Sequence, residues 1–173
     1  METMEAILSR RSIRSYTDQP ITDEQVHQIL TAGMSGPSAV NARDWHFIVV
    51  RGEALEGLAQ AAGRAGAIIR RSQMTVLICC DESRAFPPAK QYAVIDGAIA
   101  GQNMILAAQS MGIGSVWLGV WPQDGKVEAQ KNYFKLPETA VPHSLIAFGY
   151  PAEDKSGEPH PDYEESRVHW NQW

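Results

Sequence analysis

Apolar residues recur along this chain at two different spacings, which predict where helices and strands lie. An apolar residue every three or four positions is typical of a helix, whereas short runs rich in Val, Ile and aromatic residues are typical of strands. On this basis the predicted helices span 4–10, 22–33, 54–62, 92–111 and 124–134, and the predicted strands span 46–51, 75–80, 115–121 and 144–149. Two helices are therefore expected first, followed by strands and helices in alternation.

Local signals mark the boundaries of the second helix. Thr22 and Gln25 have the spacing of a capping box, in which each side chain binds the backbone N–H of the other residue. Gly36 and Pro37 end the helix, and 38–44 is expected to be an irregular loop.

The longest predicted helix, 92–111, is apolar and rich in small residues, so it is expected to be central. Small side chains allow a neighbouring helix or backbone to approach closely. The close neighbour is either another part of the same domain or a second subunit.

Composition restricts the class of protein. With 173 residues and 44% hydrophobic content, the chain is expected to form one domain. The net charge of −5 argues against a general nucleic-acid or anionic-membrane binder. No stretch approaches the roughly 20 apolar residues of a membrane span, and the N-terminal sequence does not have the pattern of a signal peptide. A cytoplasmic location is expected.

Cysteines and histidines give no sign of a metal site or a disulfide framework. Cys79 and Cys80 are adjacent in a predicted buried strand. The five histidines are scattered without the i, i+4 spacing of a helical metal pair. We therefore predict no metal.

A cluster of cations follows the first predicted helix. Arg10, Arg11 and Arg14 lie within five residues, together with the hydroxyl of Ser12. Guanidinium groups present paired donors that match phosphate oxygens, so a phosphorylated ligand is one interpretation. The alternative is a solvated basic run at the end of a helix. Arg70 and Arg71 form a second, smaller cluster that is either a ligand contact or a solvated helix face.

Several nucleotide and hydrolase motifs do not occur. The run from Gly112 to Gly119 lacks the G-x-G-x-x-G spacing and leads into a strand, and no P-loop sequence is present. No Ser, His and acid set occurs in the local context that hydrolysis requires.

The C-terminal segment combines a polar, Pro-rich stretch from Pro151 with a return of aromatic residues at Tyr163, Trp170 and Trp173. Large aromatic side chains are rarely left in water at the end of a chain, so this tail is expected to dock. It docks either on its own domain or on another subunit.

Five strings in order carry a resemblance: Arg10 to Arg14, Pro37 to Asn41 followed by Trp45-His46-Phe47, Asp96 to Ala108, Gly112 to Gly119, and Arg167-Val168-His169. Together they resemble the nitroreductase family of FMN-dependent oxidoreductases. The resemblance implies an α+β three-layer sandwich, with a central mixed β-sheet and helices on both faces. It further implies one nitroreductase-like domain over 1–173 and a homodimer with FMN at the interface. Because of its aromatic residues, 151–173 is expected to be a C-terminal tail that docks on the partner subunit.

The resemblance also implies which residues contact FMN. Arg10, Arg11, Ser12 and Arg14 would meet its phosphate, its ribityl side and the N1 and C2 carbonyl edge of the ring, and Arg167 would be the remaining phosphate ligand. Pro37, Ser38, Ala39 and Asn41 would contact the flavin from the facing subunit. Trp117, Leu118 and Gly119 would lie along the isoalloxazine, with the N–H of Gly119 or Val120 aimed at N5. No side chain is expected to be catalytic.

The implied activity is a ping-pong cycle, in which NAD(P)H reduces FMN by hydride transfer and an electron-poor acceptor such as a nitroaromatic or quinone then takes the electrons. The alternatives are a flavoenzyme of the same fold with dehalogenating, flavin-fragmenting or thiazoline-oxidising chemistry, and a non-catalytic FMN-binding module. Two features differ from the family pattern. Many relatives have an acidic residue where this chain has Gly119. In addition, only a short segment, with 86–91 as its second half, separates the second strand from the central helix, where larger members have inserted helices.

Overall fold

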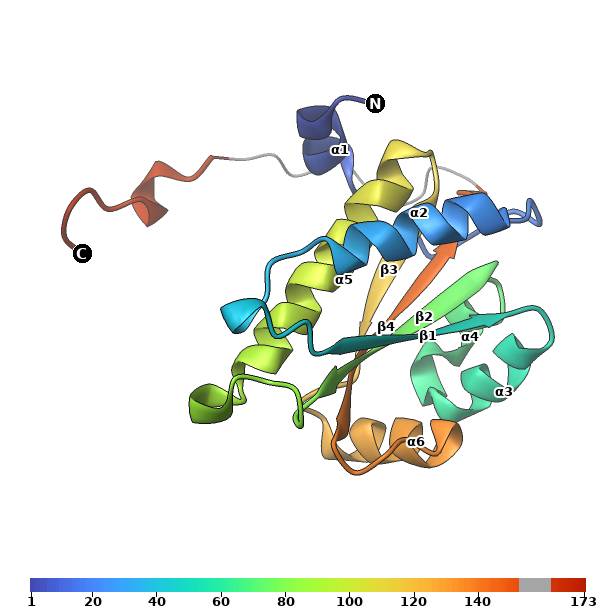
Figure 1. Cartoon of the computed structure of the whole chain (residues 1–173). Coiled ribbons are helices and arrows are strands. Elements are labelled where there is room, and N and C mark those ends of the chain that lie inside the picture. Colours follow the sequence, from blue (N-terminus) through green and yellow to red (C-terminus); the bar gives the residue numbers. More distant parts are fainter. Residues whose placement is uncertain (153–162) are drawn as a thin grey trace.

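Four strands form one antiparallel sheet in the order β1-β2-β4-β3 in this computed structural model, which describes residues 1–152 and 163–173 (Figure 1). The strands are β1 (Trp45–Arg51), β2 (Met74–Asp81), β3 (Gly114–Gly119) and β4 (Ala140–Gly149). The sheet was expected to be mixed. All pairs in its ladder are antiparallel, and the only parallel pairing in the described part is a single bridge between Ser12 and Ser115.

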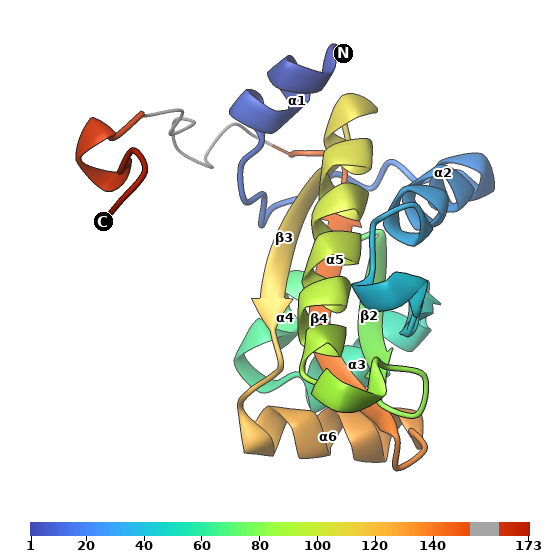
Figure 2. The ribbon, with the colours of Figure 1, turned by 60° about the vertical axis from the view of Figure 1, so that its left-hand side comes forward.

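Helices cover both faces of the sheet, as the expected three-layer architecture requires (Figures 1 and 2). The six α-helices of the described part are α1 (Thr3–Ser9), α2 (Asp23–Met34), α3 (Ala54–Ala61), α4 (Gly66–Ile69), α5 (Tyr92–Ser110) and α6 (Asp124–Phe134). β2 is central and buried from Met74 to Cys80, which explains why its sequence is a continuous apolar run.

Alternate residues of the central strands feed two separate cores, because successive side chains of a strand point to opposite faces. On one face Ile78 and Ile146 pack with α2 and α5. On the other face Leu77 and Leu145 pack with α3, α4 and α6. Each fully buried aliphatic side chain contributes about 1.5–3 kcal/mol, so these two cores are what holds the layers together.

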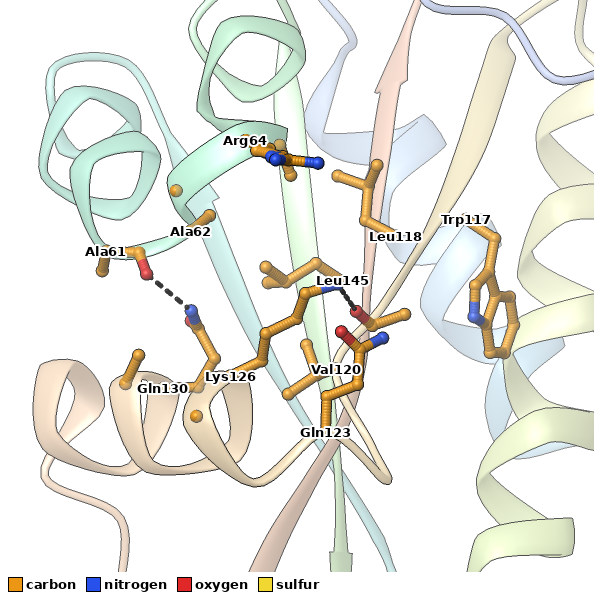
Figure 3. A pocket seen from close by; sticks show the side chains of 15 residues that line it. Ala61, Ala62, Arg64, Trp117, Leu118, Val120, Gln123, Lys126, Gln130 and Leu145 are labelled. Carbon is orange, nitrogen blue, oxygen red and sulfur yellow. Dashed lines mark hydrogen bonds between the residues drawn. The ribbon is translucent and has the colours of Figure 1, made fainter.

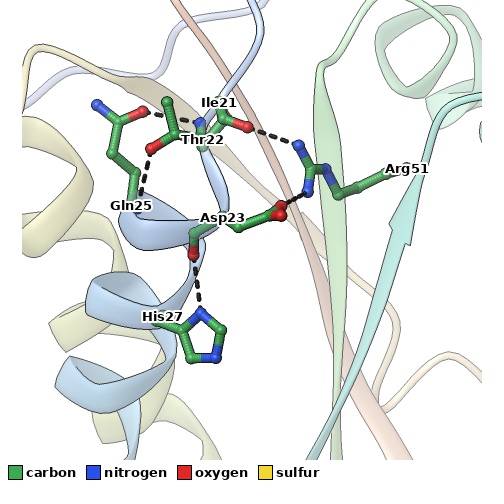
Figure 4. A network of polar contacts seen from close by, with 6 residues as sticks. All are labelled: Ile21, Thr22, Asp23, Gln25, His27 and Arg51. Atoms are coloured by element: carbon green, nitrogen blue, oxygen red, sulfur yellow. Dashed lines mark hydrogen bonds and ion pairs between the residues drawn. The ribbon is translucent and has the colours of Figure 1, made fainter.

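Helix α2 is fixed to the edge strand by a polar network at its first turn (Figure 4). The predicted capping box is present, with Gln25 N–H donating to the Thr22 hydroxyl and Thr22 N–H donating to the Gln25 side chain. Arg51 of β1 pairs with Asp23 at 2.6 Å and donates to the Ile21 carbonyl, also at 2.6 Å. The network therefore ties the first turn of α2 to β1.

Helix α5 is central, as its apolar sequence predicts (Figure 2). Its glycines lie against the side chains of the sheet. A Cβ at Gly97 would lie 2.8 Å from the Cys80 sulfur, and one at Gly101 would lie 2.4 Å from the Trp117 ring. Close packing within the domain therefore explains these two small residues. The opposite side of the helix leaves Tyr92 and Ile95 exposed, 46% and 53% respectively.

The predicted order of elements is confirmed, with differences at strand ends. The strand predicted at 144–149 begins earlier, at Ala140, although Pro142 cannot donate to a ladder. The register shifts between Ile78 and Cys79, so Pro142 pairs at a bulge where the missing N–H costs little. The strand predicted at 115–121 ends at Gly119, because the amides of Val120 and Trp121 both donate to the His143 carbonyl. Helix α4 is only four residues long and was not predicted.

The C-terminal residues 163–173 extend away from the domain (Figures 1 and 2). They contain one short 3-10 turn, Glu165–Arg167. Most of the polar stretch that was predicted before them lies outside the described residues.

Candidate functional site

The arginine segment is anchored to the start of β3 through its backbone. Ile13 N–H donates to the Ser115 carbonyl at 2.8 Å, and the Ile13 and Tyr16 side chains are buried. The Tyr16 hydroxyl donates to the Ile13 carbonyl at 2.6 Å, and burial raises the pKa of Tyr16 well above its ordinary value, so it stays a donor. Arg10, Arg11 and Ser12 are half-buried and Arg14 is exposed. The segment thus presents cations from a fixed backbone.

A cavity of about 730 Å³ opens at the other end of β3 (Figure 3). Its wall includes Trp117, Leu118 and Gly119, which the resemblance placed along the flavin ring. The remaining wall comes from α6 and the residues that join it to β3, from Leu145 of β4, and from the end of α3 with the turn after it. The fold thus brings the 61–65 turn and Leu145 against the nearly continuous segment from β3 to α6.

The charged side chains that line this cavity are both cations, Arg64 and Lys126. Lys126 donates to the Gly119 carbonyl at 3.1 Å, and the Arg64 side chain points into the cavity (Figure 3). None of the described residues in the lining has a carboxylate, although the protein is acidic overall. The cavity therefore favours a ligand that is anionic or that becomes anionic on reduction.

Gly119 leaves the cavity open, because a Cβ built there would meet nothing within 4 Å. Two backbone amides were predicted to face the ligand. The Val120 amide donates to the His143 carbonyl at 3.3 Å, so the Gly119 amide is the better candidate.

The loop with Pro37, Ser38, Ala39 and Asn41 lies elsewhere, against the first half of α5. It includes a short 3-10 turn, Ala39–Asn41, and lines a separate cavity of about 330 Å³ together with Tyr92, Ile95 and Ile99. The two cavities share no lining residue. Within one chain, the structure does not bring this loop to the β3 site.

Arg167 also lies apart from the β3 site. It pairs with Glu164 at 2.6 Å in the exposed tail. Arg70 pairs with Glu56 at 2.7 Å on the surface, and neither Arg70 nor Arg71 lines the cavities described above.

Sequence reasoning missed Arg64 and Lys126. Each stands in a segment without an apparent motif, and only the meeting of α3, α6 and β3 places them together. Nothing in the local sequence could have identified them.

Burial keeps three other titratable groups of the core in their neutral forms. Burial raises the pKa of Cys79 and of Cys80 to about 12, so both thiols stay protonated. Burial also lowers the pKa of His143, which favours its neutral form. Among the described residues, no group of three or more His, Cys, Asp or Glu side chains is placed to hold a metal ion.

Comparison with known proteins decides the family. The model of the nitroreductase family matches residues 7–150, which include the arginine segment, the 37–41 loop and β3. The chain belongs to the nitroreductase family. The resemblance found in the sequence is thereby confirmed, as is the expected fold class, since the structural neighbours are nitroreductases.

Relatives and solved structures match this chain over almost its whole length. A relative from Methanothermobacter thermautotrophicus, whose name includes NAD(P)H nitroreductase, is 40% identical over 173 residues, which is 100% of this chain and 88% of the relative. The FMN reductase [NAD(P)H] of Bacillus subtilis is 28% identical over 91% of this chain and 69% of its own length. The structure of NADPH:FMN oxidoreductase from Vibrio harveyi complexed with NAD⁺ has a TM-score of 0.85 at 29% identity, covering 99% of this chain and 77% of that protein.

In the described part of the chain, no helix has the length and apolar character needed to cross a membrane.

Proposed function

We propose that this protein is an FMN-dependent NAD(P)H oxidoreductase that transfers electrons to an electron-poor acceptor by a ping-pong cycle. The observation that carries the proposal is the arrangement along β3. The arginine segment pairs at Ser115, and the cavity wall at Gly119 lies four residues further along. At roughly 3.3 Å per residue the two points are about 13 Å apart. This geometry suits an elongated ligand with an anionic group at one end and a ring at the other.

The residues present fit FMN. The half-buried Arg10, Arg11 and Ser12 would hold the phosphate and ribityl side with charge-assisted hydrogen bonds. The open space at Gly119 leaves room for a flat ring, and its amide would donate at the ring edge. When bound, FMN would supply the hydride chemistry, accepting from NAD(P)H and delivering to the acceptor.

Cations near the ring would do more than bind. Arg64 and Lys126 line the ring cavity, and positive charge there stabilises the negative charge that arises on reduction. Because none of the described lining residues is an acid, the chain's own groups would bind and orient, and solvent would supply protons.

We further propose a homodimer in which each flavin site takes residues from both chains. The 37–41 loop lies apart from the β3 site of its own chain. Val40 in this loop is 71% exposed, and Ile95 beside the loop is 53% exposed. A second subunit covering this face would bury those side chains and bring its loop to the facing flavin. The tail would dock on the same partner, since Trp170 and Trp173 are 78% and 101% exposed on their own chain.

The purified protein tests the function directly. We expect a yellow protein with flavin absorbance that oxidises NAD(P)H with menadione or a nitrofuran in the steady state. Flavin absorbance without turnover would instead indicate a binding module, and a colourless protein that takes up no added FMN would contradict the proposal.

Complementation tests the shared site. Inactive Arg14→Ala chains mixed with inactive Asn41→Asp chains should regain part of the activity, because a heterodimer would assemble one intact site from the two unaltered halves. Each variant alone, taken through the same mixing procedure, is the control. Heterodimers that form but stay inactive would show that both residues serve the same chain's flavin.

A further inference from the structure

Asp96 is a buried carboxylate on α5 that holds the 37–41 loop. Asp96 is 3% exposed. Both of its carboxylate oxygens lie 3.1 Å from the backbone nitrogen of Ala39, whose N–H donates to them. Three further hydrogen bonds lie within the loop: Asn41 N–H donates to the Ser38 carbonyl, Ala42 N–H to the Ala39 carbonyl, and Arg43 N–H to the Ser38 hydroxyl. The end of the loop is held by Asp81 N–H, which donates to the Asp44 carbonyl at 2.7 Å, and by the Arg43 guanidinium, which donates to the Met34 carbonyl at 3.5 Å. The bond to Asp96 attaches the first half of the loop, at Ala39, to α5.

The loop needs such an attachment because its backbone is strained. Val40, Asn41 and Arg43 have φ of 48°, 57° and 51°, in the left-handed region that residues with a Cβ seldom adopt. Conformations of this kind persist only where surrounding contacts enforce them. Without the bond to Asp96, the loop would relax toward other conformations.

A second buried carboxyl group lies at the end of the same loop. Asp44 is 0% exposed, and its carboxylate oxygens have no hydrogen-bond partner among the described residues. Burial and the negative charge of Asp96 raise the pKa of Asp44. Burial raises the pKa of Asp96 as well, but the hydrogen bond from Ala39 opposes that rise, because it stabilises the carboxylate form. Of the two carboxyl groups, Asp96 is therefore the one that accepts a hydrogen bond from the loop.

We propose that Asp96 is a positioning residue of the flavin site, which fixes the 37–41 loop in the conformation that contacts FMN through its hydrogen bond from Ala39. The inference rests on the proposed function, since the loop is taken to face a flavin.

Substitutions of Asp96 test this through FMN affinity. The dissociation constant of FMN should rise about tenfold or more in Asp96→Ala, because a charge-assisted hydrogen bond is lost. Asp96→Asn keeps one oxygen that can accept from Ala39 and should recover much of the affinity. Asp44→Asn is the matched control, since it alters the other buried carboxyl group, whose oxygens have no hydrogen-bond partner among the described residues, and it should bind FMN as the wild type does.

Removing the donor gives an independent test. Ala39→Pro deletes the N–H but suits the backbone, because Ala39 is the first residue of the 3-10 turn and Ser38 before it is extended (φ −138°, ψ 156°). Ala39→Pro should weaken FMN binding to a similar degree as Asp96→Ala. The double variant should bind FMN only slightly more weakly than either single variant, since the two single variants and the double variant all lack the same hydrogen bond. Additive losses would show that Asp96 acts by another route and would overturn the proposal.

Hydrogen exchange separates positioning from folding. In Asp96→Ala the amides of residues 39–42 should exchange faster, while those of β2 keep their protection. If β2 loses protection too, Ala39→Pro alone decides: unchanged FMN affinity in that variant overturns the inference. If Asp96→Ala is folded and binds FMN as tightly as the wild type, the inference is also wrong. A wild-type protein that does not bind FMN would instead contradict the proposed function.

Discussion

The arginine segment at 10–14 and the tail at 163–173 both carry predicted phosphate ligands, yet the fold treats them differently. The first is tied to β3 by the Ile13 amide and is fixed by the buried side chains of Ile13 and Tyr16. The tail has one internal ion pair, between Arg167 and Glu164, and a ring contact between His169 and Trp173 at 4.4 Å. Its two tryptophans remain exposed.

The difference shows that an arginine binds a ligand tightly only when its backbone is ordered. Fixing a residue costs about 1–2 kcal/mol, and buried apolar area must offset that cost. In the arginine segment, the buried side chains of Ile13 and Tyr16 offset this cost within the segment's own domain. The tail has aromatic side chains that could offset this cost, but Trp170 and Trp173 are not covered by the described part of the chain. On our proposal, the partner subunit would cover them and so order Arg167.

The largest expected effect comes from removing the tail. Truncation after Tyr163 should lower both dimer stability and FMN affinity, the latter by about a hundredfold or more, because a phosphate ligand and the docking aromatics are lost together. Sedimentation and FMN titration measure the two quantities. Arg167→Ala is the control and should lower FMN affinity alone. A truncated chain that stays dimeric and binds FMN tightly would remove Arg167 from the site.

The next largest effect concerns the anchored arginines. Arg10→Ala and Arg14→Ala should each weaken FMN binding by about 2–3 kcal/mol, the contribution of a charge-assisted bond to a partly buried anion. Arg71→Ala is a matched control, since Arg71 is exposed and lines none of the cavities described above. Equal dissociation constants for the wild type and both variants would refute the assignment.

The anchor itself can be broken by one methyl group. A Cβ at Gly114 would lie 2.7–2.9 Å from three atoms of Ile13, so Gly114→Ala should displace the arginine segment. We expect a loss of about 1–3 kcal/mol in the free energy of unfolding, typical of overpacking, with weaker FMN binding. Gly57→Ala, whose Cβ would meet the movable Tyr133 hydroxyl, should be milder in thermal denaturation. Unchanged FMN affinity in Gly114→Ala would show that the anchor is dispensable.

The smallest effect is expected in the tail's ion pair. Glu164 and Arg167 have side chains 52% and 77% exposed, and a solvated pair contributes at most about 1 kcal/mol. Glu164→Gln should therefore leave the melting temperature unchanged and should not weaken FMN binding, because it frees Arg167 for phosphate. A marked fall in FMN affinity would mean that Glu164 orients Arg167 and that the tail orders itself without a partner.

Much of this protein could be predicted from the sequence, because the relevant signals are local. Periodicity located the elements, the capping box at Thr22 and Gln25 fixed the start of α2, and the order of five strings identified the family. The cation cluster at 10–14 was visible because its members are neighbours in the chain. The ends of the strands were predicted less accurately. The bulge at which Pro142 pairs depends on the register of β4 with β2, which is not a local property of the sequence.

Only the tertiary structure decided how distant residues meet. It brought Arg64 and Lys126 to the wall at Gly119, joined Asp96 to Ala39, and left the 37–41 loop away from the β3 cavity of its own chain. The physical reason is that sequence patterns record how a residue interacts with near neighbours and with the core. The position of a side chain across a cavity depends on how whole layers pack, and no single segment contains that information.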